Sequence, residues 1–360
     1  MGNSALIQGL FLTGFIVLIF GLLAMDLGIF EKKDKVVSFK RALLTTFIWM
    51  VLAAVFGLIL RCGAEKMHGV ETKEDLVETV NLYHGKTLAH KVQTVDYDTA
   101  VKAYRKQSTL EYFTGYLIEY SLSIDNIFVM ILIFSSFAVP AQYYKRVLMW
   151  GIIGAMVMRF IFIFAAGALV AKYEWILLIF GLFLLYSGIK MFVQRNKKEE
   201  MDPKKNPIVR FCSKIFPVTN EIRDHSFLRK INGRWVITPL LLCLIVIEFT
   251  DILFAVDSIP AIFSVTKDPY IVFFSNIFAI LGLRSLFFLI SSIIKMFRFL
   301  KIGLSFLLLF IGVKMIIECE PVNIDIPIAA SLIIIIAILL ISIVASVLIP
   351  EKKPQQIQPD

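Results

Sequence analysis

Nine long apolar stretches constrain the fold of this 360-residue chain more than any other feature. A helix needs roughly 20 apolar residues to cross a bilayer core about 30 Å thick. The stretches that reach or approach this length are residues 5–30, 42–61, 111–138, 148–170, 175–193, 236–265, 271–293, 302–317 and 327–349. A hydrophobic content of 58% also differs from that of soluble globular proteins. The sequence therefore predicts an all-α polytopic membrane protein with about nine transmembrane helices.

The positions of Lys and Arg predict the orientation of these helices. Connections rich in positive charge are retained in the cytoplasm. One set of alternate connections carries 23 of the 37 Lys and Arg residues, whereas the other set carries 9. We therefore expect the N-terminus outside and the C-terminus inside. The net charge of +9 is then a signal of membrane topology, and no nucleic-acid partner is expected.

Two long polar connections separate the apolar stretches into groups. The predicted units, in chain order, are two N-terminal transmembrane helices with a basic cytoplasmic loop (1–61), a polar external insert (62–110), a first three-helix unit (111–193), a basic cytoplasmic loop (194–235), a second three-helix unit (236–317), a C-terminal transmembrane helix (318–349) and a cytoplasmic tail (350–360). The insert contains a predicted short amphipathic helix that is capped at Thr72. The basic loop is expected to contact lipid headgroups.

The two three-helix units resemble each other in sequence. Matches occur at a nearly constant offset, and they pair Asp125 with Asp251, Arg159 with Arg284, Gly188 with Gly312 and Lys190 with Lys314. Because each unit has an odd number of spans, the second unit is predicted to be inverted relative to the first. Inverted repeats are typical of secondary transporters, which bind substrate near the membrane midplane where the two repeats meet.

Ionisable side chains inside the spans point to the site of function. Six carboxylates lie within predicted spans, namely Asp26, Glu119, Asp125, Glu248, Asp251 and Asp257. Each would cost roughly 2.5 to 3.5 kcal/mol if it faced lipid, so we expect these groups to face an interior path or one another. Two intramembrane arginines, Arg159 and Arg284, leave about four negative charges unmatched, enough for one divalent cation with surplus acids for protons. The alternative is that each arginine pairs with an acid and merely fixes the helix packing.

Helical geometry limits how these acids can be arranged. A step of six residues, as from Glu119 to Asp125, rotates by about 240° and rises by about 9 Å. Either the helices unwind locally, or the acids form a ladder along a path. The polar residues expected to support or compensate the site are Asp26, Ser121, Ser123, Asn126, Arg159, Ser258, Asn276 and Arg284.

The ligand types narrow the choice of cation. All four histidines are predicted to lie in loops, so the membrane core offers oxygen ligands from carboxylate, hydroxyl, amide and backbone groups. Sites of this kind suit Mg²⁺, Ca²⁺ and Mn²⁺. The cation is expected to be a substrate, and no resident cofactor is predicted.

Two acidic motifs resemble the signature segments of the TerC/Alx family of integral membrane proteins. They are the runs Glu111-Tyr-Phe-Thr-Gly-Tyr-Leu-Ile-Glu119-Tyr-Ser-Leu-Ser-Ile-Asp125-Asn-Ile-Phe and Val246-Ile-Glu248-Phe-Thr-Asp251-Ile-Leu-Phe-Ala-Val-Asp257-Ser-Ile-Pro. The resemblance covers residues 10–60 and 111–317, and it implies Mn²⁺ export across a bacterial inner or plasma membrane. It also implies that the metal path runs along Glu119, Asp125, Glu248, Asp251 and Asp257. The family was named for tellurium resistance, and the long insert 62–110 departs from its shorter members.

Three functional hypotheses follow from these observations. The first is an exporter of Mn²⁺ that works by alternating access of the two repeats, in exchange for protons or Na⁺. The second is a membrane anchor in a metal-stress, tellurium-stress or secretion complex, with a protein partner docked on 62–110 or 194–235. The third is an intramembrane aspartyl protease with an Asp125–Asp257 dyad. The Gly-x-Gly-Asp signature of such proteases is missing, so we expect no enzyme activity.

Overall fold

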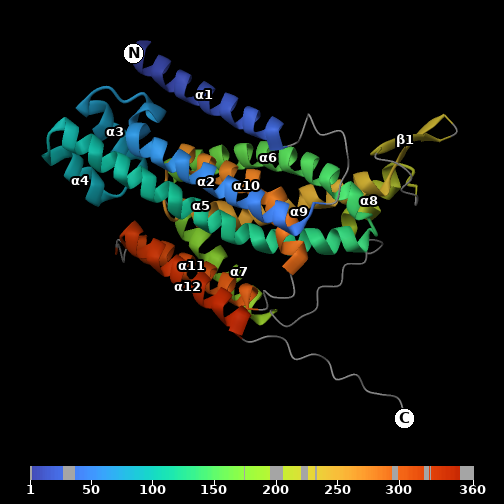
Figure 1. Ribbon diagram of the computed structural model, residues 1–360. Helices are drawn as coiled ribbons and strands as arrows, with labels where there is room; N and C mark the ends of the chain where they lie inside the picture. Colours follow the sequence, from blue (N-terminus) through green and yellow to red (C-terminus); the bar gives the residue numbers. More distant parts are fainter. Residues whose placement is uncertain are drawn as a thin grey trace.

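The computed structural model describes residues 2–26, 37–173, 175–194, 206–219, 226–231, 233–293, 299–319, 324 and 326–348. Within these ranges nine helices are long and apolar enough to cross a membrane, which confirms the predicted all-α membrane protein. They are α1 (Gly2–Asp26), α2 (Phe39–Gly63), α5 (Tyr97–Ser136), α6 (Tyr144–Lys172), α7 (Ile176–Val193), α9 (Pro239–Phe263), α10 (Pro269–Ile293), α11 (Leu300–Glu318) and α12 (Ile328–Leu348). Most of them run side by side in one elongated bundle (Figure 1).

Helix α5 is longer than the apolar stretch that predicted it. It has 40 residues and begins at Tyr97, with Asp96 as N-cap accepting a hydrogen bond from the Thr99 backbone N–H at 3.0 Å. A helix of this length extends about 60 Å, roughly twice the thickness of a bilayer core. The last residues assigned to the insert are therefore the first turns of α5. The sequence did not predict that α5 continues into the insert, because hydropathy identifies only the apolar part of a helix.

The insert is folded, and it packs on the end of the bundle. It comprises the 3₁₀ helix η1 (Ala64–His68), α3 (Lys73–Tyr83) and α4 (Lys86–Thr94). Helix α3 begins as predicted, because Thr72 and Asp75 cap each other reciprocally at its first turn. At the end of η1, Gly69 has φ 65° and abuts the Ser4 backbone, so a larger residue would clash with the start of α1.

The basic connection between α7 and α9 also contains regular structure that the sequence did not predict. A short helix α8 (Pro207–Ile215) is followed by a hairpin of β1 (Leu228–Ile231) and β2 (Arg234–Ile237), antiparallel with Leu228 opposite Ile237. Figure 1 shows the insert at one end of the bundle and this hairpin at the other. The two connections thus lie at opposite ends, as the alternation of basic loops requires. Which end faces the cytoplasm stays a prediction.

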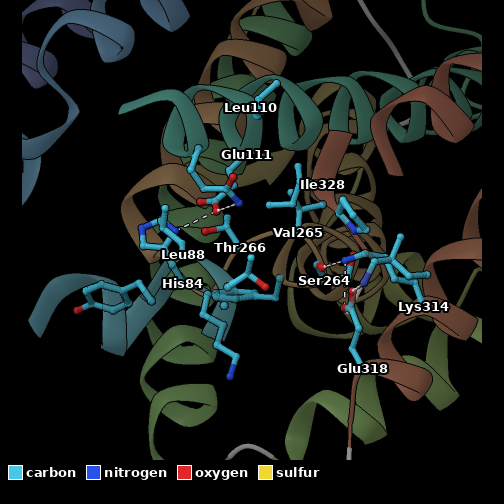
Figure 2. Close-up of a pocket in the computed structure, with 18 of the residues that line it drawn as sticks. His84, Leu88, Leu110, Glu111, Ser264, Val265, Thr266, Lys314, Glu318 and Ile328 are labelled. Carbon is cyan, nitrogen blue, oxygen red and sulfur yellow. Dashed lines mark hydrogen bonds and ion pairs between the residues drawn. The ribbon is translucent and has the colours of Figure 1, made fainter. Parts of the chain in front are cut away.

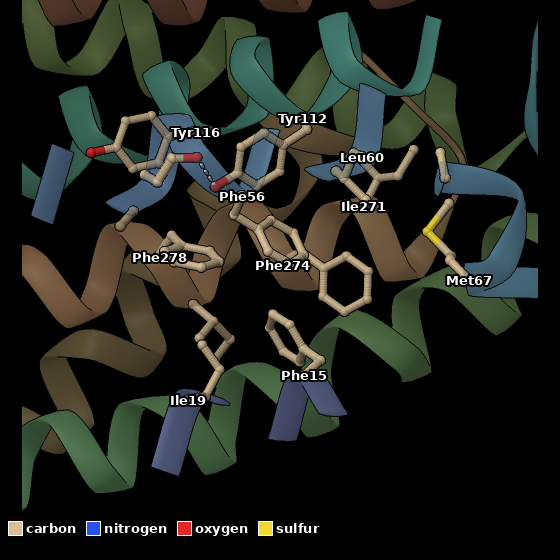
Figure 3. Packing of buried hydrophobic residues seen from close by; sticks show 14 of the residues in the cluster. Phe15, Ile19, Phe56, Leu60, Met67, Tyr112, Tyr116, Ile271, Phe274 and Phe278 are labelled. Atoms are coloured by element: carbon tan, nitrogen blue, oxygen red, sulfur yellow. Dashed lines mark hydrogen bonds between the residues drawn. The ribbon is translucent and has the colours of Figure 1, made fainter. Parts of the chain in front are cut away.

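Aromatic side chains hold α1 and α2 against the centre of the bundle. Phe15 of α1 and Phe56 of α2 pack against Phe274 and Phe278 of α10, with ring centroids 4.3 to 6.4 Å apart (Figure 3). Tyr112 of α5 joins this cluster and donates its hydroxyl proton to the Ala53 carbonyl at 3.1 Å. Helix α10 is the most deeply buried of the nine spans and forms the centre of the packing.

The neighbours of the six central helices agree with the predicted repeat. Helix α5 packs on α10, α6 packs on α9, and α7 packs on α11. Exchanging α5 with α9, α6 with α10 and α7 with α11 converts the first two pairs into each other and leaves the third unchanged. A pseudo-two-fold relation would produce this pattern. The repeat and its inversion stay predictions.

Candidate cation site

Arg159 lies at the meeting point of four helices. Its Nη1 group donates to Glu119 Oε1 of α5 and, at 2.6 Å, to Asn276 Oδ1 of α10. Its Nη2 group donates to Asp251 Oδ1 of α9 at 3.3 Å. Arg159 itself comes from the middle of α6. One guanidinium thus connects both predicted three-helix units at their acidic motifs.

The cluster of Arg159, Glu119, Asp251 and Asn276, here called the acid–arginine cluster, is closed to solvent and incompletely paired. None of the four side chains is more than 4% exposed. Glu119 Oε2, Asp251 Oδ2 and Arg159 Nε are buried and lack a hydrogen-bond partner. An unpaired buried polar atom costs about 1 to 3 kcal/mol, and more when it is charged. Two carboxylates against one guanidinium also leave one formal negative charge, so the cluster has both the charge and the free oxygens to hold a further cation.

Two neutral side chains fix the geometry of the cluster. The amide nitrogen of Asn276 donates to the Val272 carbonyl at 3.0 Å, which directs the amide oxygen toward Arg159. Ser123, one turn after Glu119 on α5, places its hydroxyl 3.5 Å from Glu119 Oε1. An Asn and a Ser supply the oxygen ligands that hard cations accept. Both residues belong to the predicted supporting set.

Glu248 lies one turn before Asp251 on α9, and its carboxylate rests against Gly154 of α6. A Cβ at position 154 would overlap the Glu248 carboxyl group. The missing side chain of Gly154 therefore makes the space in which this carboxylate lies. No feature of a single sequence marks Gly154 among the other glycines of the spans, so the sequence did not predict its role.

On the cation path that the sequence predicts, Gly154→Ala is expected to displace the Glu248 carboxylate and to lower the transport rate about tenfold, the lower end of the cost of changing an outer-shell residue of a metal site. Gly151→Ala is a matched control on the same helix, because a Cβ there meets Ile247 at an ordinary 3.6 Å. Rates would be measured with both variants reconstituted at equal density in vesicles. Equal rates for the two variants would contradict a role for Glu248 on the path.

Asp257 marks a further step along α9. Its Oδ1 atom accepts a hydrogen bond from the Ser187 hydroxyl of α7 at 2.7 Å. From Glu248 through Asp251 to Asp257 the helix rises about 14 Å, and the directions of the last two acids differ by about 120° around the helix axis. These acids do not converge on one point: Asp251 faces Arg159, whereas Asp257 faces α7.

The remaining predicted site residues lie on α1, α5, α9 and α10. Asp125 is half-buried six residues after Glu119, about 9 Å further along α5. Arg284 is half-buried on α10, eight residues beyond Asn276. Ser121, Asn126 and Ser258 are buried on α5 and α9. Asp26 ends α1, and its side chain lies outside the described residues.

The helical geometry favours one of the two arrangements predicted for the acids. Helices α5 and α9 are continuous through all five acids, although Pro260 lies inside α9. The structure therefore has a ladder of carboxylates and no local unwinding at these positions. In the part of the chain that the structure describes, no three His, Cys, Asp or Glu side chains converge as ligands of one metal ion. Arg159 instead occupies the point where the two motifs meet.

Comparison with known proteins identifies the family. A profile described as "Integral membrane protein TerC family" matches residues 104–354. A Myxococcus xanthus protein described as "Uncharacterized membrane protein STKORF319" is 42% identical over 336 residues, 93% of this chain and 91% of that protein. A "Putative membrane-bound redox modulator Alx" of Photorhabdus laumondii is 37% identical over 348 residues, 96% of each chain. A Salmonella typhi protein of the same description is 46% identical over 250 residues, 69% of this chain and 76% of that one.

No solved structure matches this chain significantly. The profile match nevertheless takes in more than half of the 360 residues. It contains both acidic motifs, Arg159 and Asn276. On this evidence, the chain is a multi-pass integral membrane protein with bacterial relatives, and it belongs to the TerC family.

Proposed function

We propose that this protein exports a divalent metal cation, with Mn²⁺ as the first candidate, through the acid–arginine cluster by alternating access. The observation that carries the proposal is the buried cluster itself, in which two carboxylates share one guanidinium and two of their oxygens have no partner. Intramembrane acids are costly and by default mark an ion path. The bacterial relatives support an inner or plasma membrane location for this transport.

Arg159 suggests how the carrier would cycle. With the guanidinium between Glu119 and Asp251, the cluster carries one net negative charge in a fully buried place. A divalent cation that takes the place of the guanidinium would satisfy both carboxylates. The arginine would then act as a tethered counter-ion that returns when the cation leaves. Such an exchange keeps the buried charge small in both states, which low dielectric surroundings demand.

The ladder of acids supports passage to and from the cluster. Glu248, Asp257 and Asp125 lie at different heights on α9 and α5 and give a cation successive oxygen partners. Neighbouring acids are also positions where protons could bind when the cation departs, which would allow exchange for protons. The pairing of α5 with α10 and of α6 with α9 supports a rocking of two similar units around the cluster.

The Alx relatives carry a description as redox modulators. We assign no electron transfer to the acid–arginine cluster, because carboxylate, guanidinium and amide groups do not change oxidation state under physiological conditions. Cation transport uses the chemistry that these side chains have.

The test is a flux measurement with the purified full-length protein in proteoliposomes. Mn²⁺, Mg²⁺, Ca²⁺ and Zn²⁺ are offered in turn, and protein-free vesicles serve as the control. We expect saturable Mn²⁺ flux that exceeds Zn²⁺ flux, since the described ligands are oxygen atoms. A second series with an imposed proton or Na⁺ gradient identifies the coupling ion. Flux no greater than in protein-free vesicles for every cation would refute the proposal.

A further inference from the structure

Two buried His–carboxylate pairs connect the insert to the bundle, and the proposed cation path uses neither. His68, at the end of η1, lies 2.8 Å from Asp268, the residue that precedes α10. His84, which ends α3, lies 2.9 Å from Glu111 of α5. None of the four side chains is more than 8% exposed. The sequence placed the histidines in loops and gave them no role, although His68 and His84 lie at the ends of helical elements.

The His84–Glu111 pair lines a cavity of about 660 Å³, and so do Thr266 and Lys267, the two residues before Asp268. Figure 2 shows His84 and Glu111 on one side of the cavity, Lys314 and Glu318 on another, and Val265 and Thr266 between them. Helices α3 and α4 of the insert form one wall. His84 Nε2 and Glu111 Oε2 are buried without a hydrogen-bond partner, so each side chain of the pair has one polar atom that could still form a hydrogen bond.

In the described structure, the groups in direct contact with the two histidine rings, apart from their carboxylate partners, are uncharged. Glu111 also accepts from the Gln107 amide at 3.2 Å, and Tyr104 meets the His84 ring edge to face. His68 is stacked on Tyr83 and meets Tyr270 of α10, whose hydroxyl accepts from Gln8 of α1. Among the described residues, the other charged groups that line the cavity are Lys91, Lys106, Lys267, Lys314 and Glu318, and the Glu65–Arg105 pair joins η1 to α5. With the His84 imidazole protonated its pair with Glu111 is neutral, and without this proton the cavity wall holds a buried carboxylate.

We propose that His84 and Glu111 form a proton-binding site that latches the insert over the cavity, with the His68–Asp268 pair as a second contact between the insert and the bundle. Proton binding closes the latch because the His84 imidazolium pairs with the Glu111 carboxylate, and proton loss opens it because this buried carboxylate then lacks its cation. A buried charge that has lost its partner destabilises the contact that holds it. The site takes up protons whether or not a metal cation is present, so it goes beyond the proposed transport.

Electrostatics fixes the direction of this switch. Burial opposes the charge of His84, but Glu111 outweighs it and raises the pKa of the imidazole above its usual 6.5. Burial likewise opposes the charge of Asp268, but His68, His84 and the Tyr270 backbone N–H together outweigh it and lower the pKa of the carboxyl. The contribution of His84 is therefore complete below about pH 6.5 and is lost as the pH rises through its folded pKa. The contribution of Asp268 is present above about pH 4 and is lost only in stronger acid. The latch is closed in mild acid and opens toward alkaline pH.

The latch is joined to the cation site through Asp268. This residue caps α10, since its carboxylate accepts from the Tyr270 backbone N–H at 2.9 Å and its N–H donates to the Thr266 hydroxyl at 3.2 Å. It lies on the short connection between α9, which carries Asp251, and α10, which carries Asn276. A movement of Asp268 would therefore shift the adjoining ends of α9 and α10, the helices that carry Asp251 and Asn276 of the acid–arginine cluster.

The latch is tested by hydrogen exchange of the full-length protein in detergent micelles, comparing wild type with His84→Gln at each pH. Their ratio cancels the intrinsic pH dependence of exchange. We expect α3 and α4 to exchange several-fold faster in the variant at about pH 6 and at nearly equal rates at about pH 9. The ratio changes by at most about tenfold per pH unit for each proton released. A ratio that stays constant with pH would overturn the proposal.

Two controls keep the result interpretable. His90→Gln changes an exposed histidine of α4 in the same insert and should leave the exchange of α3 at the wild-type rate at every pH. If His84→Gln does not fold, the wild type alone suffices, with the buried Val147, Leu148 and Ile152 of α6 as internal reference. The protection of α3 relative to that reference should fall as the pH rises, and its constancy would also overturn the latch. Neither measurement depends on metal transport, so failure of the latch and failure of the proposed function are distinguishable.

Discussion

Replacing Glu119 by Gln and Asp251 by Asn together is expected to lower divalent-cation flux at least about a hundredfold, since even an outer-shell partner of a metal ligand is worth about 10 to 100-fold. Both substitutions keep the size of the side chain and remove its charge. The two carboxylates are the partners of Arg159, and each has one oxygen atom that lacks a hydrogen-bond partner. The measurement is initial Mn²⁺ flux in proteoliposomes at a cation concentration well below saturation.

The control for this double variant is Asp75→Asn, which removes a carboxylate from the same protein. Asp75 caps α3 in the insert, where the Thr72 hydroxyl and the Thr72 and Glu71 backbone N–H groups lower the pKa of its carboxyl. We expect it to lose about 1 kcal/mol of local stability in α3 and to keep the wild-type flux. Wild-type flux in the Glu119→Gln, Asp251→Asn protein would place the cation path elsewhere in the molecule.

The membrane fold was predictable because its physical basis is local. Hydropathy over about 20 residues identifies a span regardless of what it packs against, and the cap at Thr72 depends only on residues within one turn. The start of α5 at Tyr97 was missed, since a polar helix outside the bilayer gives no hydropathy signal. The hairpin at 228–237 was missed for a related reason, because two strands of four residues leave little periodic pattern.

The sequence predicts which residues belong to the candidate site, but it does not predict which of them contact each other. The cost of burying a charge in a membrane identifies Glu119, Asp251 and Arg159 one residue at a time. The choice of Glu119 as a partner of Arg159 depends on how α5 and α6 both pack on α9 and α10, because the two residues are 40 positions apart in the chain. The support of Glu248 by Gly154 depends on the approach of α6 to α9. The His–carboxylate pairs of the insert join residues up to 200 positions apart, and no local pattern brings such residues together.

Replacing Arg159 by Met is expected to lower the free energy of unfolding by about 3 to 5 kcal/mol in metal-free buffer, the usual cost of removing one partner of a buried ion pair. Glu119 and Asp251 would then face each other without their shared guanidinium. If the guanidinium and the metal cation compete for the same two carboxylates, added Mn²⁺ should raise the Tm of Arg159→Met more than that of wild type. The reason is that the cation binds the vacated carboxylates without first displacing an arginine, and a ligand of the folded state stabilises it by mass action.

The triple variant Glu119→Gln, Asp251→Asn, Arg159→Met separates competition from a simple loss of packing. It has the same methionine and no buried charge in the cluster, and uncharged replacements of buried ion pairs are often neutral or stabilising. We therefore expect its metal-free Tm to lie above that of Arg159→Met and to be insensitive to Mn²⁺. If Arg159→Met and the triple variant unfold alike and Mn²⁺ shifts neither, then Arg159 serves only to hold α5, α6, α9 and α10 together. A larger shift by Mn²⁺ in Arg159→Met alone would show that the guanidinium and the metal compete for the same two carboxylates.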